Sequence, residues 1–251
     1  MILEFLGESG QKINLTKYIV HSPIKDKLES LMKLICQIGN EPTLIFVNYR
    51  ESVERVANYL RKQSADCKMF HGGMEQVDRE KALFQFKSGS TYLLVSTDLA
   101  ARGLDILDVK HVIHYHLPVN QEAYTHRNGR TARMFAEGNA YIILHGEEHL
   151  PDYLSEEEFS EFQLQDNPPA LKPSVWASLY IGKGKKDKIS KGDIAGFLIK
   201  KGMLEKNQIG PIEVSDKCAY ASIARSELNA LLKRIRNEKI KGLKTIFEES
   251  K

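Results

Sequence analysis

The chain has 251 residues, of which 42% are hydrophobic, so it can bury one good core and has room for a second. No apolar run approaches the roughly 20 residues that cross a bilayer, and the start, Met1-Ile2-Leu3-Glu4, lacks the basic residues of a signal peptide. The three cysteines stand far apart without a Cys-x-x-Cys spacing, so neither a zinc site nor a disulfide framework is indicated. We therefore expect a soluble cytoplasmic protein with no metal site of its own.

The net charge of +3 divides into two blocks of opposite sign. Residues 1–170 hold 18 Lys and Arg against 24 Asp and Glu, whereas residues 171–251 hold 18 against 9. An acidic block followed by a basic block suggests two modules with different partners, the second of which contacts phosphate. Because lysine is also a common solvated residue, the charge by itself leaves a solvated surface that binds no phosphate as an alternative.

From about Ile13 to Leu144, short apolar runs alternate with helical patterns. The runs are nearly continuous in hydrophobic residues, as strands buried on both faces require, at 44–47, 92–95, 111–115 and 141–144. Between the first two runs, apolar residues recur at helical spacing over 53–60, and a second apolar group at 82–86 precedes Gly89. This alternation predicts βαβ units and a parallel sheet, and hence an α/β domain over residues 1–150.

A break in composition follows this domain. Residues 147–171 contain eight acidic residues and no Lys or Arg, and prolines stand at Pro151, Pro168, Pro169 and Pro173. We interpret residues 151–173 as an acidic linker, or as a terminal helix followed by a linker.

Residues 174–251 form a compact basic segment. Its patterns predict a strand, a helix, two strands, a helix and a strand, at 175–181, 192–201, 209–214, 219–223, 227–236 and 243–247. This βαββαβ order is that of an RNA-recognition motif, so we predict an α+β domain over residues 174–251.

Two stretches of the first domain carry the strongest motifs. Residues 96–105 read Ser-Thr-Asp-Leu-Ala-Ala-Arg-Gly-Leu-Asp, and residues 126–133 read His-Arg-Asn-Gly-Arg-Thr-Ala-Arg. Together they resemble motifs V and VI of DEAD-box RNA helicases, which implies the second RecA-like domain of such a motor. In that family the first RecA-like domain carries a Walker A loop and an Asp-Glu-Ala-Asp box. Neither pattern occurs in these 251 residues, so we expect the chain to be nearly inactive by itself.

The resemblance to motif VI implies how the chain contributes to catalysis. Arg130 and Arg133 resemble the family's arginine fingers, whose guanidinium groups are always charged and can bond two phosphate oxygens at once. If the segment is helical, their spacing places both on one face. By the same resemblance, His126 and Arg127 orient the motif, and Gly129 lets the backbone approach closely. The implied cofactor is ATP with Mg²⁺, held mainly by the first RecA-like domain. The alternative is an arginine-rich surface helix.

Two residues of this stretch depart from the family pattern. Asn128 stands where Ile is usual, and Ala132 stands where Gly is usual. The first replaces a packing residue with a polar one, and the second adds a methyl group beside the finger. Both changes bear on ATPase efficiency rather than on the assignment.

Motif V follows an expected strand, at the carboxyl end where open α/β sheets bind ligands. The resemblance gives Thr97 a contact to the RNA backbone, Asp105 a contact to the nucleotide ribose, and Arg102 a coupling role between the two sites. A residue such as Thr97 can equally cap a helix.

Two further stretches resemble motor motifs. Residues 44–48 match motif IV, with Phe46 in the family position. The turn at residues 71–74 and the Gln76-x-x-Arg79 pair resemble motif IVa, which implies that Gly73 and Arg79 contact the RNA backbone. An ordinary turn is the alternative for Gly73.

The basic segment resembles the RNA-binding domain of bacterial DbpA-type helicases, mainly at residues 179–189, 192–196, 209–212 and 239–242. In that family the domain anchors the enzyme to a hairpin of 23S ribosomal RNA. The expected RNA contacts are the lysines crowded in one loop and two tyrosines on the central strands: Lys183, Lys185, Lys186, Lys188, Tyr180 and Tyr220. Because both tyrosines alternate with apolar residues, packing is an equal alternative for them.

These features together predict an ATP-dependent DEAD-box RNA helicase that remodels structured RNA, namely 23S rRNA during assembly of the large ribosomal subunit. Its expected partners are that RNA and the first RecA-like domain of the same helicase. The alternative from another class is a stand-alone RNA-binding or assembly protein without ATP turnover, against which the retention of both arginines argues. A DNA helicase fragment is disfavoured by the RNA-type C-terminal segment.

Overall fold

The computed structural model of the chain describes residues 14–101, 109–131 and 137–250. They form two compact units, each of which we describe by itself. Unit 1 comprises Met1–Arg79 with Tyr92–Lys172, and unit 2 comprises Glu80–Thr91 with Pro173–Lys251. In the described ranges, no helix is both long and apolar enough to span a membrane.

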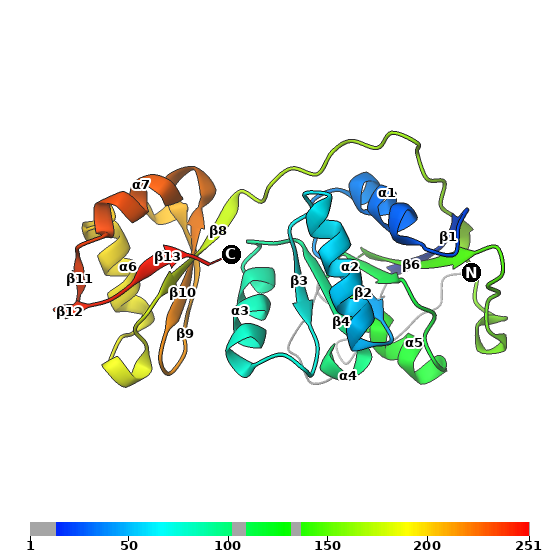
Figure 1. Cartoon of the computed structure of the whole chain (residues 1–251), viewed down its shortest axis with the longest axis horizontal. Coiled ribbons are helices and arrows are strands. Elements are labelled where there is room, and N and C mark those ends of the chain that lie inside the picture. Colours follow the sequence, from blue (N-terminus) through cyan, green and yellow to red (C-terminus); the bar gives the residue numbers. More distant parts are fainter. Residues whose placement is uncertain (1–13, 102–108, 132–136, 251) are drawn as a thin grey trace. The chain divides into compact units, whose positions relative to one another are not determined.

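Unit 1 is built on a seven-stranded sheet in which every neighbouring pair is parallel, with the strand order β3-β4-β2-β5-β6-β1-β7 (Figure 1). Its strands are β1 (Asn14–Ser22), β2 (Thr43–Val47), β3 (Cys67–Phe70), β4 (Leu93–Thr97), β5 (His111–His114), β6 (Glu137–His145) and β7 (Ser160–Glu161). The helices are α1 (Leu28–Ile38), α2 (Arg50–Lys62), α3 (Gln76–Lys87), which belongs to unit 2 from Glu80 onward, α4 (Asp98–Ala101) and α5 (Gln121–Asn128). The predicted α/β parallel sheet is confirmed.

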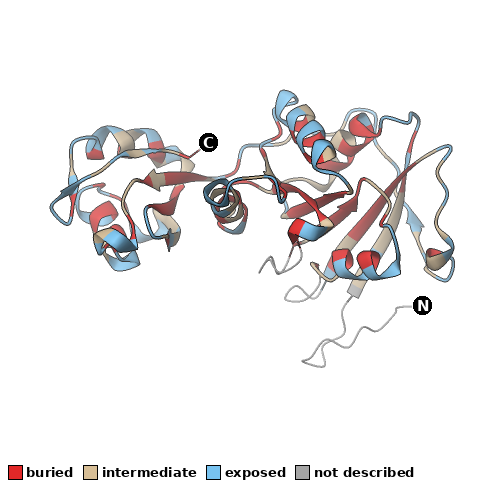
Figure 2. Cartoon of the chain, turned by 60° about the horizontal axis from the view of Figure 1, so that its bottom comes forward, coloured by how far each residue is buried: buried red, intermediate tan, exposed pale blue. Residues whose placement is uncertain are grey.

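The sheet of unit 1 is covered on both faces. All five residues of β2 and all five of β4 are buried, and the central strands are the buried layer in Figure 2. On one face, α1 and α2 share a core with Ile143, and on the other Tyr124 of α5 packs against Ile142 and Leu144. Fully burying one such side chain contributes on the order of 1.5–3 kcal/mol, which explains why the central strands need unbroken apolar runs.

The four strands predicted from apolar runs are present, whereas β1 and β3 were not singled out. In β3 only Cys67 and Phe70 are buried, so the strand carries no continuous apolar run. In β1 the only buried residues with a described side chain are Val20 and Ser22. Both strands lie towards the margins of the sheet, where one apolar face is enough.

The acidic segment predicted as a linker is packed along unit 1, so that prediction needs a correction. It includes a short 3-10 helix (Asp152–Leu154) and β7, which pairs with β1. Phe162 packs edge-on against the rings of Tyr18 and Tyr141, at centroid distances of 5.6 and 5.4 Å. Gln37 of α1 donates to the backbone oxygen of Gln163 (3.1 Å). The segment's apolar residues and free backbone groups find partners on the sheet edge, which its acidic composition concealed.

Unit 2 contains an antiparallel sheet with the order β13-β8-β10-β9 (Figure 1). Its elements are β8 (Trp176–Ile181), α6 (Lys191–Lys200), β9 (Ile209–Val214), β10 (Ala219–Ala224), α7 (Arg225–Ile235), the hairpin strands β11 (Lys239–Ile240) and β12 (Leu243–Lys244), and β13 (Phe247–Glu249). This is the predicted βαββαβ order with a hairpin inserted before the last strand. The strand predicted at 243–247 is therefore wrong in its bounds, because Thr245 and Ile246 belong to no strand and separate β12 from β13.

Candidate functional site

The carboxyl ends of the central parallel strands bring three polar residues of unit 1 together. Asn48 follows β2, Asp98 follows β4, and His116 lies two residues beyond β5. Strand β2 is hydrogen-bonded to both β4 and β5, so these three ends lie side by side at one edge of the sheet. This is the edge at which open α/β sheets bind ligands.

Arg127 of α5 joins these three strand ends. Its side chain is fully buried, and it donates from Nε and Nη2 to the two carboxylate oxygens of Asp98, at 2.6 and 2.7 Å. It also donates to Asn48 Oδ1 (2.8 Å) and to the backbone oxygen of His116 (2.7 Å). A buried guanidinium is costly unless it is paired and hydrogen-bonded, and Arg127 meets both conditions. It therefore fixes α5 to the sheet edge.

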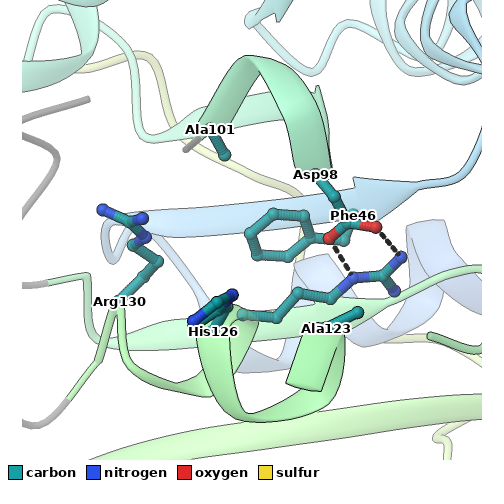
Figure 3. Close-up of a pocket in the computed structure, with 7 residues that line it drawn as sticks. Phe46, Asp98, Ala101, Ala123, His126 and Arg130 are labelled. Carbon is teal, nitrogen blue, oxygen red and sulfur yellow. Dashed lines mark hydrogen bonds and ion pairs between the residues drawn. The ribbon is translucent and has the colours of Figure 1, made fainter. Parts of the chain in front are cut away.

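Phe46 completes this assembly. Its ring is 1% exposed and lies under the Arg127 guanidinium, 5.1 Å from the centroid. A small pocket opens beside the ring, lined by Phe46, Asp98, Ala101, Ala123, His126, Arg127 and Arg130 (Figure 3). Figure 3 shows the side chain of Arg130 on the side of the pocket away from Asp98. The pocket thus has one cation fixed in its wall and a second, half-buried cation at its margin.

The backbone explains where Arg130 lies. Helix α5 begins after Asn120, whose side chain accepts a hydrogen bond from the Ala123 N–H (2.8 Å), and it ends before Gly129. Arg130 therefore follows the helix, so the condition under which Arg130 and Arg133 would share a helical face is not met at Arg130. The backbone oxygen of Arg130 accepts from the Val109 N–H (3.0 Å), which holds this residue to the segment before β5. Arg133, Arg102, Asp105 and Ala132 lie outside the described residues.

Of the residues predicted to contact RNA in unit 1, Thr97 and Gly73 lie at neighbouring strand ends, and Arg79 lies in the first turn of α3. Thr97 is the buried last residue of β4, and Gly73 lies in an exposed turn after β3. A side chain at Gly73 would lie only 3.3 Å from His71 Nδ1 and 3.5 Å from a guanidinium nitrogen of Arg50. Arg79 is half-buried over the Phe70 ring, at 5.0 Å from its centroid. Arg50, which the sequence motifs did not indicate, thus adds an exposed cation to this edge.

The lysine loop, residues 183–188 of unit 2, is held rigidly against the β9–β10 turn. The Lys185 and Lys186 N–H groups donate to the backbone oxygens of Ser215 and Asp216, both at 2.9 Å. A side chain at Gly184 would lie 2.3 Å from the Ser215 oxygen, so this close approach requires glycine. The side chains of Lys185, Lys186 and Lys188 are exposed on this fixed backbone, and Lys186 forms an ion pair with Asp216 (3.8 Å). Lys183 is half-buried and paired with Asp187 (2.9 Å).

Comparison with known proteins agrees with both units. Residues 26–135 match the helicase conserved C-terminal domain, and residues 178–249 match the DbpA RNA binding domain. The "ATP-dependent RNA helicase DbpA" of Bacillus subtilis is 32% identical over 258 residues, covering 90% of this chain and 54% of that protein. The Escherichia coli protein of the same name is 31% identical, covering 87% of this chain and 49% of that protein.

A solved structure extends this likeness to the fold. The crystallised chain of the E. coli DEAD-box protein SrmB, determined bound to RraA, is 32% identical, with a TM-score of 0.55 over 64% of this chain and 98% of that chain. The chain belongs to the DEAD-box helicase family. It spans about half the length of the curated DbpA relatives that it matches.

Asn128, which departs from the usual DEAD-box pattern, has a partner in the structure. It is buried at the end of α5, and its Oδ1 lies 3.0 Å from Nε2 of His114 on β5. Burial, followed by the nearby Arg127 charge, lowers the pKa of His114 to about 3, so the ring is neutral and its Nε2–H donates to Asn128. His114 also stacks on Tyr124, at 5.3 Å between ring centroids. A polar pair thus replaces the apolar contact that Ile would make at this DEAD-box position.

The pair predicts a specific pattern of stability. We expect His114→Val to destabilise unit 1 by about 1–3 kcal/mol, because it leaves the buried Asn128 amide without its partner. Adding Asn128→Ile should recover most of this loss, because an apolar pair of similar volume replaces both polar groups. Urea denaturation followed by far-UV circular dichroism measures both effects. A double variant less stable than the single one would contradict the pairing.

The same pair predicts a dependence on pH. An unfolded histidine titrates near pH 6.5, whereas folded His114 resists protonation down to about pH 3. The contribution of neutral His114 to the free energy of unfolding is therefore complete above about pH 6.5. It falls as the pH drops, by up to about 1.4 kcal/mol per pH unit. Buried His111 and half-buried His116, with pKa values lowered to about 4 chiefly by burial, add to this slope. In urea denaturation at several pH values, His114→Val should reduce the dependence of the free energy of unfolding on pH without abolishing it.

The two tyrosines predicted to contact RNA lie on the sheet face of unit 2. Tyr220 is 3% exposed and stacks on Phe84, with ring centroids 5.4 Å apart, and Tyr180 is half-buried beside it at 5.7 Å. This geometry favours the packing alternative for Tyr220. Base stacking by either tyrosine stays a prediction, and the RNA contacts proposed for unit 2 rest on the lysine loop.

Proposed function

We propose that this chain supplies the second RecA-like domain and an RNA anchor to an ATP-dependent helicase that remodels structured RNA. The observation that carries the proposal is the buried Arg127 assembly. It fixes the helix that precedes half-buried Arg130 to the carboxyl edge of a parallel sheet, where such sheets bind ligands. A solvated arginine-rich helix would not need an arginine that is 1% exposed and bonded at every side.

In this proposal, ATP with Mg²⁺ binds mainly to the first RecA-like domain, and this chain completes the nucleotide site. Arg130 and Arg133 meet the charge that develops on the γ-phosphate, Asp105 contacts the ribose, and Arg102 couples the nucleotide and RNA sites. Of these four, Arg130 lies in the described part of the chain, where it lines the pocket beside Phe46. Arginines supplied across an interface raise phosphoryl transfer by about 10³–10⁵-fold.

RNA is proposed to contact both units. On unit 1, Thr97, Gly73 and Arg79 take the RNA backbone. The positions of Thr97 and Gly73 at neighbouring strand ends support this role, and Arg79 lies in the first turn of α3, which follows the turn that contains Gly73. On unit 2, the lysine loop takes phosphate groups. Three exposed ammonium groups stand on this fixed loop, and Asp216 lies 3.8 Å from that of Lys186, so their repulsion is compensated only in part. Phosphate relieves the remaining repulsion, and neutralised phosphates release counterions.

The proposed target is a hairpin of 23S rRNA, bound in the cytoplasm during assembly of the large ribosomal subunit. The match of residues 178–249 to the DbpA RNA binding domain supports RNA as the ligand, and the resemblance to DbpA-type helicases suggests this particular RNA.

A binding titration at fixed salt tests this target. The intact chain is titrated with the 23S rRNA hairpin and with an unrelated hairpin of equal length, and the lysine-loop variant K185Q/K186Q/K188Q is the control. We expect at least about a tenfold preference for the ribosomal hairpin, equivalent to about 1.4 kcal/mol, and its loss in the variant. Equal, steeply salt-dependent binding to both hairpins would remove the rRNA target and leave a general RNA clamp. Absence of binding to either would remove the anchor.

A further inference from the structure

A short hairpin in unit 2 carries lysines that the lysine loop does not include. Strands β11 and β12 pair antiparallel, with Ile240 opposite Leu243 and Lys239 opposite Lys244. The two turn residues, Lys241 and Gly242, both have positive φ, at 54° and 79°, as a tight two-residue hairpin turn requires. Ile240 is 1% exposed and anchors the hairpin in the core beside α6 (Figure 1). The hairpin is therefore a defined element of the fold.

Lys239 and Lys244 face each other across this hairpin. Directly opposite residues have Cβ atoms about 4.5–5.5 Å apart, and like charges at such positions are destabilising. Both side chains are exposed, and within the described ranges neither forms an ion pair with a carboxylate. The neighbouring acid, Glu238, pairs with Lys201 instead (3.1 Å). The free protein thus holds two ammonium groups together without a counter-charge.

Lys241 connects the hairpin to the lysine loop. Its ammonium donates to the backbone oxygen of Lys188 (2.8 Å) and to the carboxylate of Asp193 (3.0 Å). Hydrogen bonds from Ser190 and then from Lys241 lower the pKa of Asp193 to about 2, so this carboxylate stays charged and neutralises Lys241. Lys241 therefore has a structural role, and the turn of the hairpin is fixed beside Lys188.

We propose that Lys239 and Lys244 form a second phosphate-binding site, which takes phosphate groups of the same RNA that the lysine loop binds. The inference rests on the proposed function for the class of ligand, RNA. A cross-strand pair of ammonium groups on an exposed hairpin recognises paired negative charge, and the adjoining loop already presents three exposed lysines. Phosphate between Lys239 and Lys244 converts their repulsion into two charge-assisted contacts.

The test compares two double variants of the intact chain. K239Q/K244Q removes the proposed site. K200Q/K206Q removes the same charge from two other exposed lysines. Lys200 is the last residue of α6, roughly 10 Å along the axis from Asp193, and Lys206 begins the short 3-10 helix Lys206–Gln208 before β9. Binding of an RNA hairpin is measured from about 0.05 to 0.3 M salt, and the slope of log K against log salt is compared.

We expect K239Q/K244Q to bind roughly tenfold more weakly at about 0.1 M salt and to lower the magnitude of the slope by about 1.4–1.8, or about 0.7–0.9 for each phosphate contact. Each single variant should lower the slope by about half as much, and K200Q/K206Q should keep the parent slope. Because the repulsion is removed, the melting temperature of K239Q/K244Q without RNA should be equal to or above that of the parent. A melting temperature at or above that of the parent therefore distinguishes loss of the phosphate-binding site from misfolding.

Other results would overturn the inference. Equal loss in the two double variants would show that only the general positive field acts, and an unchanged slope would show that the hairpin makes no phosphate contact. Unchanged RNA binding with lost binding of a polyglutamate peptide would assign the hairpin to an acidic protein. A parent chain that binds no RNA would contradict the proposed function itself, an outcome distinct from failure at Lys239 and Lys244.

Discussion

Replacing Arg130 with alanine is expected to lower RNA-stimulated ATP turnover by about 10³-fold once the chain is joined to a first RecA-like domain. That domain can be taken from the B. subtilis DbpA relative, of which the chain covers 54%. The variant would lose the guanidinium that meets the charge developing on the γ-phosphate. Arg130 is half-buried at the margin of the pocket, and its backbone oxygen is bonded to the Val109 N–H. Steady-state phosphate release at saturating RNA measures the effect.

The matched control is Arg130→Lys, which keeps the charge but loses the planar fork that bonds two phosphate oxygens. We expect this variant to stay well below the parent rate, while RNA affinity of both variants is unchanged. A turnover within a fewfold of the parent in Arg130→Ala would contradict the finger assignment. A parallel loss of RNA affinity would instead assign Arg130 to RNA binding.

Replacing Asp98 with alanine should lower the free energy of unfolding of unit 1 by about 3 kcal/mol, the largest effect on stability that we predict for a single variant. The side chain of Arg127 is 0% exposed, so the variant leaves a buried guanidinium without its carboxylate. Part of the cost is offset, because Asn48 and the His116 carbonyl still accept hydrogen bonds from Arg127. In urea denaturation, far-UV circular dichroism reports the helices of both units, whereas the fluorescence of the single tryptophan, Trp176, reports unit 2, so a transition seen only by circular dichroism belongs to unit 1.

The control removes the other partner as well. Asp98→Ala combined with Arg127→Met should be more stable than Asp98→Ala alone, because the double variant no longer buries an unpaired guanidinium. The carboxylate of Asp98 is 24% exposed and keeps some water in the parent. The Trp176 transition should stay where it is in the parent. Our account of the buried pair would be wrong if Asp98→Ala unfolded at the parent's urea concentration.

The fold was predictable where local pattern and burial agree. Unbroken apolar runs identified β2, β4, β5 and β6, because strands covered on both faces exclude polar residues. In unit 2, the capping box between Ser190 and Asp193 begins α6 within one residue of its predicted start. The inserted hairpin was missed because β11 and β12 have only two residues each, too few for a periodic pattern.

The candidate site was predictable as motifs but not as a network. Arg127 was expected to orient motif VI, yet its partners Asn48 and His116 come from distant parts of the chain and share no motif with it. A polar residue directly after a buried strand was the available signal, and Asp98 and Asn48 both carry it. The pairing of Asn128 with His114 depends on how α5 crosses the sheet, which no local spacing encodes.

The docked acidic segment shows a further limit of composition. Its acids and prolines indicated a linker, because such residues rarely form a core. Phe162 nevertheless packs on Tyr18 and Tyr141, and Asn40 donates to the Lys172 oxygen (2.7 Å), so the segment follows unit 1 to its end. A few well-placed apolar and amide groups hold the segment in position, together with an ion pair between Glu157 and Lys17 of β1.

The central claim is that this chain completes an RNA-dependent ATPase, and one measurement tests it most directly. The intact chain is fused to the first RecA-like domain of the B. subtilis relative, and ATP hydrolysis is measured with and without structured RNA. Our account predicts RNA-stimulated hydrolysis in the fusion and almost none in either half alone. A folded fusion that binds RNA but hydrolyses no ATP would contradict it, and would leave an RNA-binding protein without turnover.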